Sequence, residues 1–286
     1  MKIKRISLFL IVMCLSLSGY AQFKTPPQGK ITEDSIYSNI LGANRNYSVY
    51  LPKSYATDQN KKYPVLYLLH GLYDTNKGWV TRGHLQDVAN RIIDSGESCE
   101  MIIVLPDAGT FMNGYFNMEG WSYETFFFTE FIPFIDNKYR TIADKQHRAI
   151  AGLSMGGGGA TAYAQKHPDM FSSSYAMSAL MTLPKEGGIP DKDKKIQELN
   201  RTVIENSCVD FVTTSDENVR EQLRSIRWFV DCGDDDFLFD ANIAFCKEMK
   251  NANIPYQLRV RDGGHVWEYW HSALYMAIPF VSDGFK

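Results

Sequence analysis

Short apolar segments alternate with longer amphipathic ones along most of the chain, from Asn46 to the C-terminal region. Several short segments are continuous runs of Val, Ile, Leu and Tyr, which is typical of strands buried on both faces of a sheet. They predict seven strands, at residues 47–51, 64–70, 101–105, 148–151, 173–178, 228–232 and 256–260. Apolar positions at helical spacing predict helices at residues 84–95, 122–139, 155–167, 240–251 and 268–279. The alternation indicates an α/β fold with a mostly parallel central sheet flanked by helices.

Three segments need separate treatment. The residues before Asn46 predict an antiparallel strand, with Gly42, Ala43 and Asn44 as the turn. The aromatic-rich helix at 122–139 is expected to face the core rather than a ligand. Charged, helix-prone residues between the strands near 178 and 228 form an insertion. Because loops after parallel strands border the ligand crevice, the insertion at 181–227 is expected to be either a cap over a site or surface elaboration.

The first 21 residues have the pattern of a secretory signal peptide. Three basic residues precede an apolar run at 6–17, and Gly19 and Ala21 are small residues at the −3 and −1 positions of a cleavage site. The run is shorter than the ~20 residues of a membrane-spanning helix. We expect cleavage before Gln22, export to the periplasm or the medium, no stable membrane insertion afterwards, and a single domain at 22–286.

Composition and charge narrow the classes of function. The 286 residues are 44% hydrophobic and 22% charged, as in folded soluble domains, which excludes a disordered or collagen-like chain. The 30 Lys and Arg and 33 Asp and Glu give a net charge of -3 without a long run of like charge, so no nucleic-acid partner is predicted. Cys99, Cys208, Cys232 and Cys246 lack zinc-type spacing, and we expect free thiols rather than a disulfide framework.

The strongest chemical signal is the sequence Gly152-Leu153-Ser154-Met155-Gly156, between a predicted strand and a predicted helix. A sharp strand-to-helix turn holds such a serine in a strained conformation and leaves no room for side chains two positions before and after it, a requirement that Gly152 and Gly156 meet. The turn exposes the Ser154 hydroxyl and directs the Met155 N–H toward a developing oxyanion. Ser154 is therefore the predicted nucleophile, and Met155 a predicted oxyanion donor.

A second oxyanion donor is expected in the loop after the strand at 64–70. Gly71 leaves the next backbone N–H free to point into the site, so Leu72 is the predicted donor and Tyr73 the fallback. His70, in the same loop, is expected to hold the loop by hydrogen bonds rather than to act as a base.

A serine hydroxyl needs a general base to become reactive. In folds with this elbow the order along the chain is serine, acid, histidine. His265 follows the strand at 256–260 by a short loop through Gly263 and Gly264, from which an imidazole can reach Ser154. His271, inside a predicted helix, is expected to pack against the body of the protein. The other three histidines have surface interpretations: His84, His147 and His167.

The base needs an acid that fixes its tautomer, and this acid is expected directly after the strand at 228–232. Asp236 is the favoured residue, and Asp235 and Asp240 are the alternatives. The carboxylates there lack the D-x-D-x-D-G spacing of a calcium loop, so no metal is predicted.

Together these residues resemble the α/β-hydrolase esterases of the esterase D type, which include family-one carbohydrate esterases such as feruloyl and acetylxylan esterases. The resemblance spans essentially the whole mature chain and rests on 64–71, 103–107, 131–135 with 139–141, the elbow at 152–157, 232–238, and 263–265 with Trp267 and Trp270. It also covers Pro133, which we expect to bend its helix.

The resemblance implies a single-domain α/β-hydrolase fold and a cofactor-free serine esterase. Its triad would be Ser154, Asp236 and His265, with the N–H groups of Met155 and Leu72 as the oxyanion hole. The aromatic residues near predicted loops are candidates for stacking on a sugar or a phenolic acid, and buried packing is the alternative for each. They are Phe111, Tyr115, Trp121 and Trp267.

We therefore expect an exported carboxylic-ester hydrolase that acts on acylated plant polysaccharides or oligosaccharides through an acyl-enzyme, with feruloyl and acetyl esters as leading substrates. An acyltransferase or a peptidase with the same triad is one alternative. A non-catalytic carbohydrate-binding protein of this fold is another.

Overall fold

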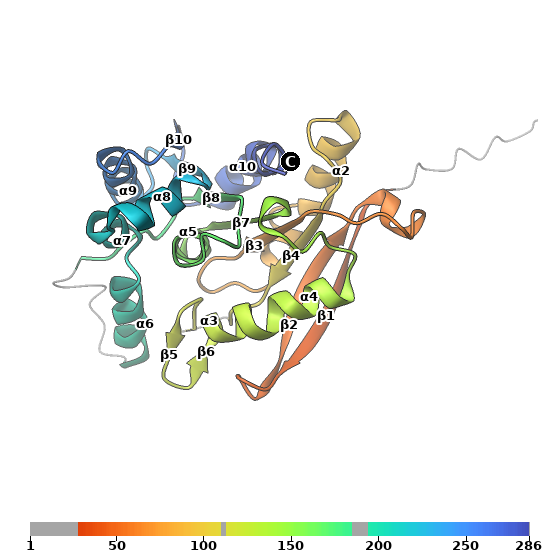
Figure 1. The fold of residues 1–286 in the computed structure, drawn as a ribbon, viewed down its shortest axis with the longest axis horizontal. Helices are drawn as coiled ribbons and strands as arrows, with labels where there is room; N and C mark the ends of the chain where they lie inside the picture. Colours follow the sequence, from red (N-terminus) through yellow and green to blue (C-terminus); the bar gives the residue numbers. More distant parts are fainter. Residues whose placement is uncertain (1–27, 110–112, 185–193, 286) are drawn as a thin grey trace, which may run out of the picture.

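The computed structural model describes residues 28–109, 113–184 and 194–285, so the predicted leader and Phe111 lie outside the described residues. Eight strands form one sheet in the order β1-β2-β4-β3-β7-β8-β9-β10 (Figure 1). They are β1 (Lys30–Ser38), β2 (Ala43–Leu51), β3 (Val65–Leu69), β4 (Ile102–Pro106), β7 (Arg148–Leu153), β8 (Ser173–Met177), β9 (Arg227–Gly233) and β10 (Tyr256–Arg261). β2 is antiparallel to β1 and β4, and the other neighbours are parallel. The predicted mostly parallel sheet is confirmed.

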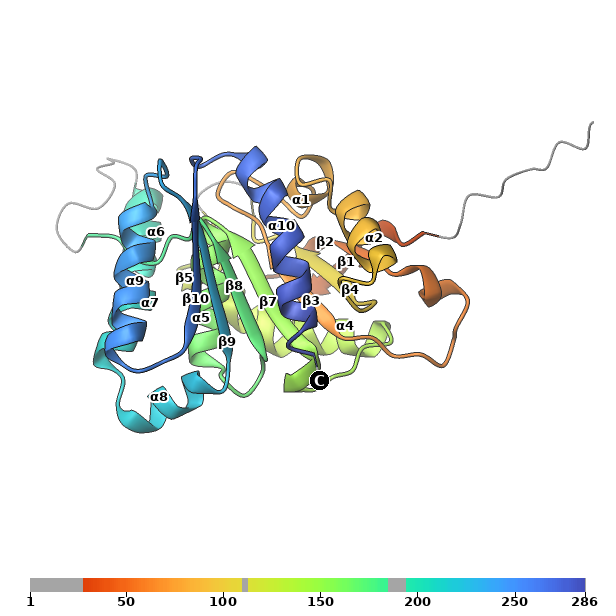
Figure 2. The ribbon, with the colours of Figure 1, turned by 90° about the horizontal axis from the view of Figure 1, so that it is seen from above.

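Helices cover both faces of this sheet (Figure 2). One face packs against α2 (Leu85–Ser95) and α10 (Trp267–Ser282), which share an apolar cluster with the strands. The other face packs against α5 (Met155–Lys166), α7 (Cys208–Thr214) and α9 (Phe239–Asn251). Both faces of the central strands are therefore removed from water, which explains the continuous apolar sequences of β3 and β4.

The first hairpin closes earlier than the sequence predicts. Ser38 pairs with Ala43, so Ala43 and Asn44 belong to β2 and the turn lies at 39–42. The Ser38 hydroxyl accepts the N–H of Leu41 at 2.9 Å, and Gly42 takes a positive φ of 62°. A side-chain hydrogen bond and a left-handed glycine thus complete the turn before Ala43.

The aromatic helix predicted at 122–139 consists of three consecutive helical stretches. They are α3 (Tyr123–Phe126), a π-helical turn at Phe127–Phe131, and α4 (Ile132–Lys138). The π-helical turn ends two residues before Pro133, which has no N–H to donate. The hydrogen-bond pattern therefore changes where the α-helical ladder is already interrupted. Phe127 and Phe131 are buried in the core, as predicted.

The insertion between β8 and β9 contains α6 (Lys194–Glu205), α7 and α8 (Glu217–Arg224). α7 continues the helical layer, because the Cys208 carbonyl accepts the Gln165 side chain of α5 at 3.0 Å. α6 lies beside the small hairpin of β5 (Asn117–Met118) and β6 (Trp121–Ser122), where Glu198 accepts the N–H of Glu119 at 2.8 Å. The described part of the insertion thus packs against the body of the protein.

Two further findings concern the described residues. Cys99, Cys208, Cys232 and Cys246 are free thiols, as predicted. Across the three described ranges, no helix combines the length and apolarity needed to span a bilayer.

Parallel strands bring distant parts of the chain to one edge of the sheet. Leu69 at the end of β3 pairs with Gly152 of β7, and Leu153 pairs with Met177 of β8. Met177 in turn pairs with Asp231 of β9. The loops that follow these strands therefore meet at the same edge, which is where ligands bind in open α/β sheets.

Candidate active site

Ser154 lies in a sharp turn between β7 and α5, with φ 54° and ψ −120°. Its N–H donates to the Met177 carbonyl at 2.9 Å, so β8 holds the turn in place. The two flanking glycines leave no room for a side chain. A Cβ on Gly152 would lie 2.3 Å from the Gly156 carbonyl oxygen, and one on Gly156 would lie 2.4 Å from that of His70. The predicted elbow is therefore present, with both glycines required by close backbone contact.

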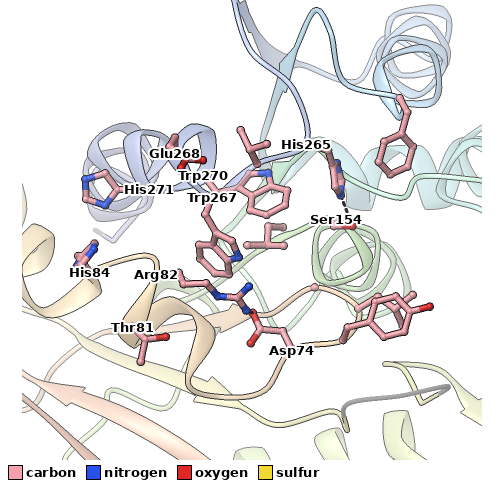
Figure 3. Close-up of a pocket in the computed structure, with 16 residues that line it drawn as sticks. Asp74, Thr81, Arg82, His84, Ser154, His265, Trp267, Glu268, Trp270 and His271 are labelled. Carbon is pink, nitrogen blue, oxygen red and sulfur yellow. Dashed lines mark hydrogen bonds and ion pairs between the residues drawn. The ribbon is translucent and has the colours of Figure 1, made fainter.

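His265 and Asp236 converge on Ser154 from two other loops. The Nε2 of His265, in the β10–α10 loop, lies 2.9 Å from the Ser154 Oγ (Figure 3). Its Nδ1 lies 3.0 and 2.9 Å from the two carboxylate oxygens of Asp236, in the β9–α9 loop. The three side chains form one hydrogen-bonded chain, in which the carboxylate fixes the imidazole with its Nε2 toward the hydroxyl.

The environment of Asp236 keeps it ionised. Burial raises the pKa of this carboxyl group, but hydrogen bonds from His265, the Leu238 N–H and Ser178 outweigh burial and hold the pKa below its usual range. The Leu238 N–H donates at 2.8 Å. The two alternative acids, Asp235 and Asp240, are exposed. The structure thus brings Asp236 to His265, as the favoured prediction stated.

Aromatic rings lie on two sides of the imidazole. The Phe237 ring centroid lies 4.4 Å from that of His265, and the Trp270 ring meets His265 edge-on at 4.8 Å. Phe237 is 77% exposed, whereas Trp270 is buried. The two hydrogen bonds of the imidazole leave it free to rotate about the line that joins Asp236 to Ser154. The contacts with Phe237 and Trp270 restrict that rotation.

The two predicted oxyanion donors lie beside Ser154. Met155 is the first residue of α5, so its N–H has no partner within the helix. A Cβ on Gly71 would lie 3.6 Å from the Ser154 Cβ, which places the chain entering Leu72 against the serine. Leu72 and the fallback Tyr73 both line the adjacent pocket. In this arrangement backbone N–H groups can donate to the oxyanion that forms when a carbonyl carbon bonds to the Ser154 Oγ.

His70 holds the loop that carries Leu72. It is buried, with Nδ1 2.8 Å from the Gly71 carbonyl oxygen and Nε2 accepting the Ala108 N–H at 3.0 Å. Burial lowers the pKa of His70, which fits a neutral ring that donates with one nitrogen and accepts with the other. The predicted structural role of His70 is confirmed.

A pocket of about 1110 Å³ opens beside Ser154. Near the serine its lining is largely apolar, and farther away it carries charged and polar groups (Figure 3). Arg82 lies 2.8 Å from the Asp74 carboxylate, and its guanidinium lies 4.6 Å from the centre of the Trp267 ring. The apolar lining is Leu72, Leu153, Phe237, Val266, Trp267 and Trp270, and the polar lining includes Asp74, Thr81, Arg82, His84, Glu268 and His271.

Of the aromatic residues proposed to contact substrate, Trp267 lines this pocket. Tyr115 does not: it is 1% exposed, and its hydroxyl donates to the His70 carbonyl at 3.0 Å. Trp121 does not line the pocket either, because it stacks on Tyr123 and donates its Nε1–H to the Gly114 carbonyl at 2.8 Å. The prediction for Tyr115 is corrected, since its buried ring supports the core. Trp121 is partly exposed beside the β5–β6 hairpin, outside this pocket.

Several pocket residues were missed by sequence reasoning. Phe237 directly follows Asp236, and this position was the available signal. Arg82 and His84 had no such signal, because they reach the pocket only through the fold of α1 (Gly78–Thr81) and the start of α2. His271 donates from Nδ1 to the Gly83 carbonyl at 2.8 Å, so it packs against the body as predicted and also lines the pocket.

Among the described residues, one acidic group has ligand atoms close enough to share a cation. It consists of Asp234, Asp235 and Asp262, all exposed, with their oxygens within 4.8 Å of one another. The Asp234 carboxylate already accepts the Gly263 N–H at 3.2 Å, which accounts for part of this clustering as loop structure.

Comparisons with known proteins point in one direction. Residues 38–281 match the family Esterase, described as "Putative esterase". A solved ferulic acid esterase shares 58% sequence identity and a TM-score of 0.87, over 91% of this chain and 99% of that one. A solved CE1 ferulic acid esterase from Anaeromyces mucronatus, with 20% identity and a TM-score of 0.71 over 90% of this chain and 92% of that one, shares the fold.

Two sequence relatives extend this result. Esterase Rv1288 of Mycobacterium tuberculosis is 30% identical over 255 residues, which cover 80% of this chain and 54% of the relative. An endo-1,4-beta-xylanase/feruloyl esterase of Xylanibacter ruminicola is 31% identical over 175 residues, covering 58% of this chain and 24% of that protein. The chain thus spans about half the length of the curated esterases that it matches over most of its residues.

Proposed function

Because the chain belongs to the Esterase family and its described residues form a serine carboxylic-ester hydrolase domain, we propose that Ser154, His265 and Asp236 are its catalytic triad. The observation that carries this proposal is the unbroken hydrogen-bonded chain from the Ser154 hydroxyl through His265 to the buried carboxylate. It has the geometry in which an ordinary serine becomes a nucleophile at neutral pH.

The reaction proceeds in two halves. The Ser154 Oγ attacks the ester carbonyl carbon while His265 Nε2 takes the hydroxyl proton. The tetrahedral intermediate then collapses, the bond to the alcohol oxygen breaks, and His265 returns its proton to the departing alcohol. A water molecule repeats the sequence on the acyl-enzyme, giving the free acid and restoring the Ser154 hydroxyl. Asp236 stabilises the imidazolium that forms twice in this cycle.

The oxyanion of each intermediate is held by the backbone N–H groups of Met155 and Leu72. Met155 supports this role because it begins the 12-residue helix α5, whose N-terminus carries partial positive charge. Leu72 supports it because the loop from Gly71 passes against Ser154 and is fixed by His70.

The proposed substrates are feruloyl and acetyl esters of plant cell-wall polysaccharides or oligosaccharides. The solved relative at 58% identity is a ferulic acid esterase, and a further relative is a xylanase/feruloyl esterase. The pocket supports the larger acyl group, because about 1110 Å³ is far more than an acetyl group fills. Its apolar near end and polar far end, with Trp267 between them, suit a flat aromatic ring that carries polar substituents.

We also propose export, from the leader pattern of residues 1–21. Expression of the full chain in a Gram-negative host is expected to place the protein outside the cytoplasm. N-terminal sequencing should then begin at Gln22. A cytoplasmic protein that retains Met1 would contradict this proposal.

Substitution of the nucleophile tests the catalytic proposal. Ser154→Ala is expected to lower kcat/KM for methyl ferulate, acetylated xylan and a nitrophenyl ester by about 10⁴-fold or more, because the acyl-enzyme cannot form. His265→Ala should match it. His147→Ala is the control, since His147 pairs with Asp144 at 2.8 Å outside the pocket and should retain the parent rate. A Ser154→Ala variant as active as the parent would overturn the assignment.

A further inference from the structure

The pocket carries polar groups that the mechanism above does not use. A feruloyl ring offers them only a hydroxyl and a methoxy group. The volume of about 1110 Å³ also exceeds the about 300–1,000 Å³ of pockets that enclose drug-sized ligands. The pocket therefore has both the room and the polar groups for a second part of the substrate beside the acyl group. These groups are Asp74, Thr81, Arg82, His84, Glu268 and His271.

Arg82 is held in place by two of its neighbours. Its Nη2 lies 2.8 Å from the Asp74 carboxylate, and its guanidinium lies over the Trp267 ring, 4.6 Å from the ring centre. Figure 3 shows the guanidinium between these two side chains. The Arg82 side chain is nevertheless 51% exposed. Because a guanidinium has several N–H donors, donors remain for a ligand after the ion pair has formed.

The Asp74 carboxylate is part of the folded loop rather than a flexible surface charge. Asp74 is buried, and its Oδ1 accepts the Thr75 N–H at 2.8 Å. A Cβ on Gly78 of α1 would lie 1.9 Å from the Asp74 Oδ2, so a glycine makes room for the carboxylate. Asp74 is three residues from Gly71, which adjoins Ser154, and three residues span at most about 11 Å. The ion pair is thus fixed close to the nucleophile.

The ring beneath Arg82 is fixed as well. Trp267 meets Trp79 edge-on at 5.2 Å and Trp270 edge-on at 5.4 Å, measured between ring centroids. Trp79 is fully buried and donates its Nε1–H to the Leu69 carbonyl at 3.0 Å. Arg82 and Trp267 therefore form one ordered wall of the pocket, with a donor surface backed by an aromatic ring.

This wall has the chemistry that binds a sugar. Sugar hydroxyls accept hydrogen bonds from a guanidinium and donate to a carboxylate, and Arg82 and Asp74 offer both partners side by side. The C–H groups of a sugar ring pack on aromatic side chains, which Trp267 supplies. The apolar part of the same pocket, with Leu72, Leu153 and other residues, has no such groups and suits the acyl group.

We propose that Arg82, oriented by Asp74, is a specificity-determining residue that binds the sugar to which the acyl group is esterified. This inference rests on the proposed function. The pocket then holds both sides of the ester, with the acyl group at its apolar end and the sugar at its polar end. Because the sugar hydroxyls that contact Arg82 take no part in bond breaking, the contact stabilises substrate and transition state alike and acts on KM.

The test compares Arg82→Ala with Arg91→Ala in the full chain. The substrates are a feruloylated arabinoxylan oligosaccharide and methyl ferulate, which has no sugar. Arg82→Ala is expected to lower the ratio of kcat/KM for the oligosaccharide to kcat/KM for methyl ferulate about tenfold, mainly through the KM of the oligosaccharide, because charged hydrogen bonds to its hydroxyls are lost. Arg91→Ala is the matched control and should keep the parent ratio. Its guanidinium also lies over a ring, 5.8 Å from the centre of Tyr275, but it does not line the pocket.

Binding of the deacylated oligosaccharide tests the sugar contact without turnover. In a Ser154→Ala background, NMR titration of the Trp267 indole N–H gives its Kd, which is expected to rise about tenfold when Arg82→Ala is added. Arg82→Lys is the second variant, since it keeps a positive charge beside Asp74 and so preserves the loop. It should show most of the same loss, because an ammonium lacks the planar set of donors.

Two outcomes would overturn the inference. One is an Arg82→Ala variant whose ratio and Kd equal those of Arg91→Ala. The other is an equal loss of kcat/KM for both esters with the parent Kd for the deacylated oligosaccharide, because Arg82 would then act on the acyl group or on the fold. A parent enzyme that cleaves methyl ferulate while Arg82→Ala leaves the ratio unaltered rejects the sugar contact alone. A parent that cleaves neither ester rejects the proposed function, and the titration still decides whether Arg82 binds the sugar.

Discussion

Ser154 keeps a backbone conformation, φ 54° and ψ −120°, that costs on the order of 1–3 kcal/mol in a residue with a Cβ. The surrounding hydrogen bonds impose it. The Ser154 N–H donates to Met177, and the Ser154 carbonyl accepts from Gly158 and Leu180 at 3.0 and 2.9 Å. The same conformation brings the hydroxyl to His265, so the strained turn also positions the proposed nucleophile.

The negative charge of Asp236 can be tested by a single substitution. Asp236→Asn is expected to lower kcat/KM by about 10⁴-fold, because the amide stabilises the wrong imidazole tautomer and no imidazolium. Asp235→Asn, with its exposed side chain, should stay near the parent rate. If both variants lost the same amount of activity, the contact between Asp236 and His265 would not identify the catalytic acid.

The pH dependence of folding follows from the same carboxylate. The folded pKa of Asp236 lies below its ordinary value of 3.8, so ionised Asp236 contributes stability that is complete above that value and is lost as pH falls through the folded pKa. The stability advantage of the parent over Asp236→Asn should therefore shrink as pH falls below about 4, because protonated Asp236 no longer accepts its ionic hydrogen bonds. Urea unfolding at several pH values measures it.

At the residue scale, the sequence predicts those residues whose chemistry requires a particular position in the fold. Ser154 is given by its glycine-flanked turn, and Asp236 and His265 by their order after successive strands. Tyr115 was placed wrongly, because aromatic composition does not say whether a ring turns to the core or to the pocket. Arg82 was missed for the related reason that its neighbour Trp267 is remote in sequence.

Helix α5, which directly follows Ser154, has four consecutive glycines after its first residue, Met155, a composition that weakens an isolated helix. Close packing explains them. A Cβ on Gly157 would lie 2.8 Å from the Ala179 Cβ, one on Gly158 2.2 Å from the Leu180 carbonyl oxygen, and one on Gly159 2.9 Å from the Tyr115 ring. The glycines let the helix N-terminus approach the sheet edge closely enough to place the Met155 N–H at the site.

Gly156→Ala tests this packing at the element scale. The added Cβ would meet backbone atoms of β3 and its loop, with the His70 oxygen at 2.4 Å and the Leu69 oxygen at 2.7 Å, and neither can rotate away. The variant is expected to lose about 3 kcal/mol or more of unfolding free energy and most of its activity. Gly42→Ala is the control, since nothing lies within 4 Å of its Cβ and only the φ of 62° is strained. A loss no larger than that of Gly42→Ala, measured by urea unfolding, would contradict this account.

Predicted elements matched the structure where local pattern and tertiary packing agree. The strands predicted at 148–151 and 228–232 lie inside β7 and β9, because short, mainly apolar segments suit the middle of a sheet covered on both faces, even with Arg148 and Asp231 among their residues. The helix predicted at 122–139 contains a π-helical turn that was not predicted, because the spacing of apolar residues is nearly the same in α- and π-helices. α7 was not predicted, because it is only seven residues long.

At the scale of the whole molecule, one buried charge joins the sheet to the C-terminal helix. Asp231 of β9 is fully buried and accepts the hydroxyls of Tyr175 on β8 and Tyr269 on α10, at 2.6 and 2.7 Å. The guanidinium of Arg259 on β10 donates to the same carboxylate at 3.0 Å, and Arg261 stacks over the Tyr269 ring. Three strands and α10 therefore meet at a single carboxylate, and α10 begins two residues after His265.

Asp231→Ala is expected to destabilise the protein by about 3–5 kcal/mol, because it leaves buried hydroxyls and a partly buried guanidinium without their acceptor. Unlike a surface pair, this network is shielded from water and salt, so the loss should persist at high ionic strength. Arg201→Ala, which removes an exposed pair with Glu205, should change stability by less than about 0.5 kcal/mol. Because β10 and α10 flank the loop that carries His265, the Asp231→Ala molecules that remain folded should show a reduced kcat. If Arg201→Ala lost as much stability as Asp231→Ala, the buried carboxylate would not be the contact that joins the sheet to α10.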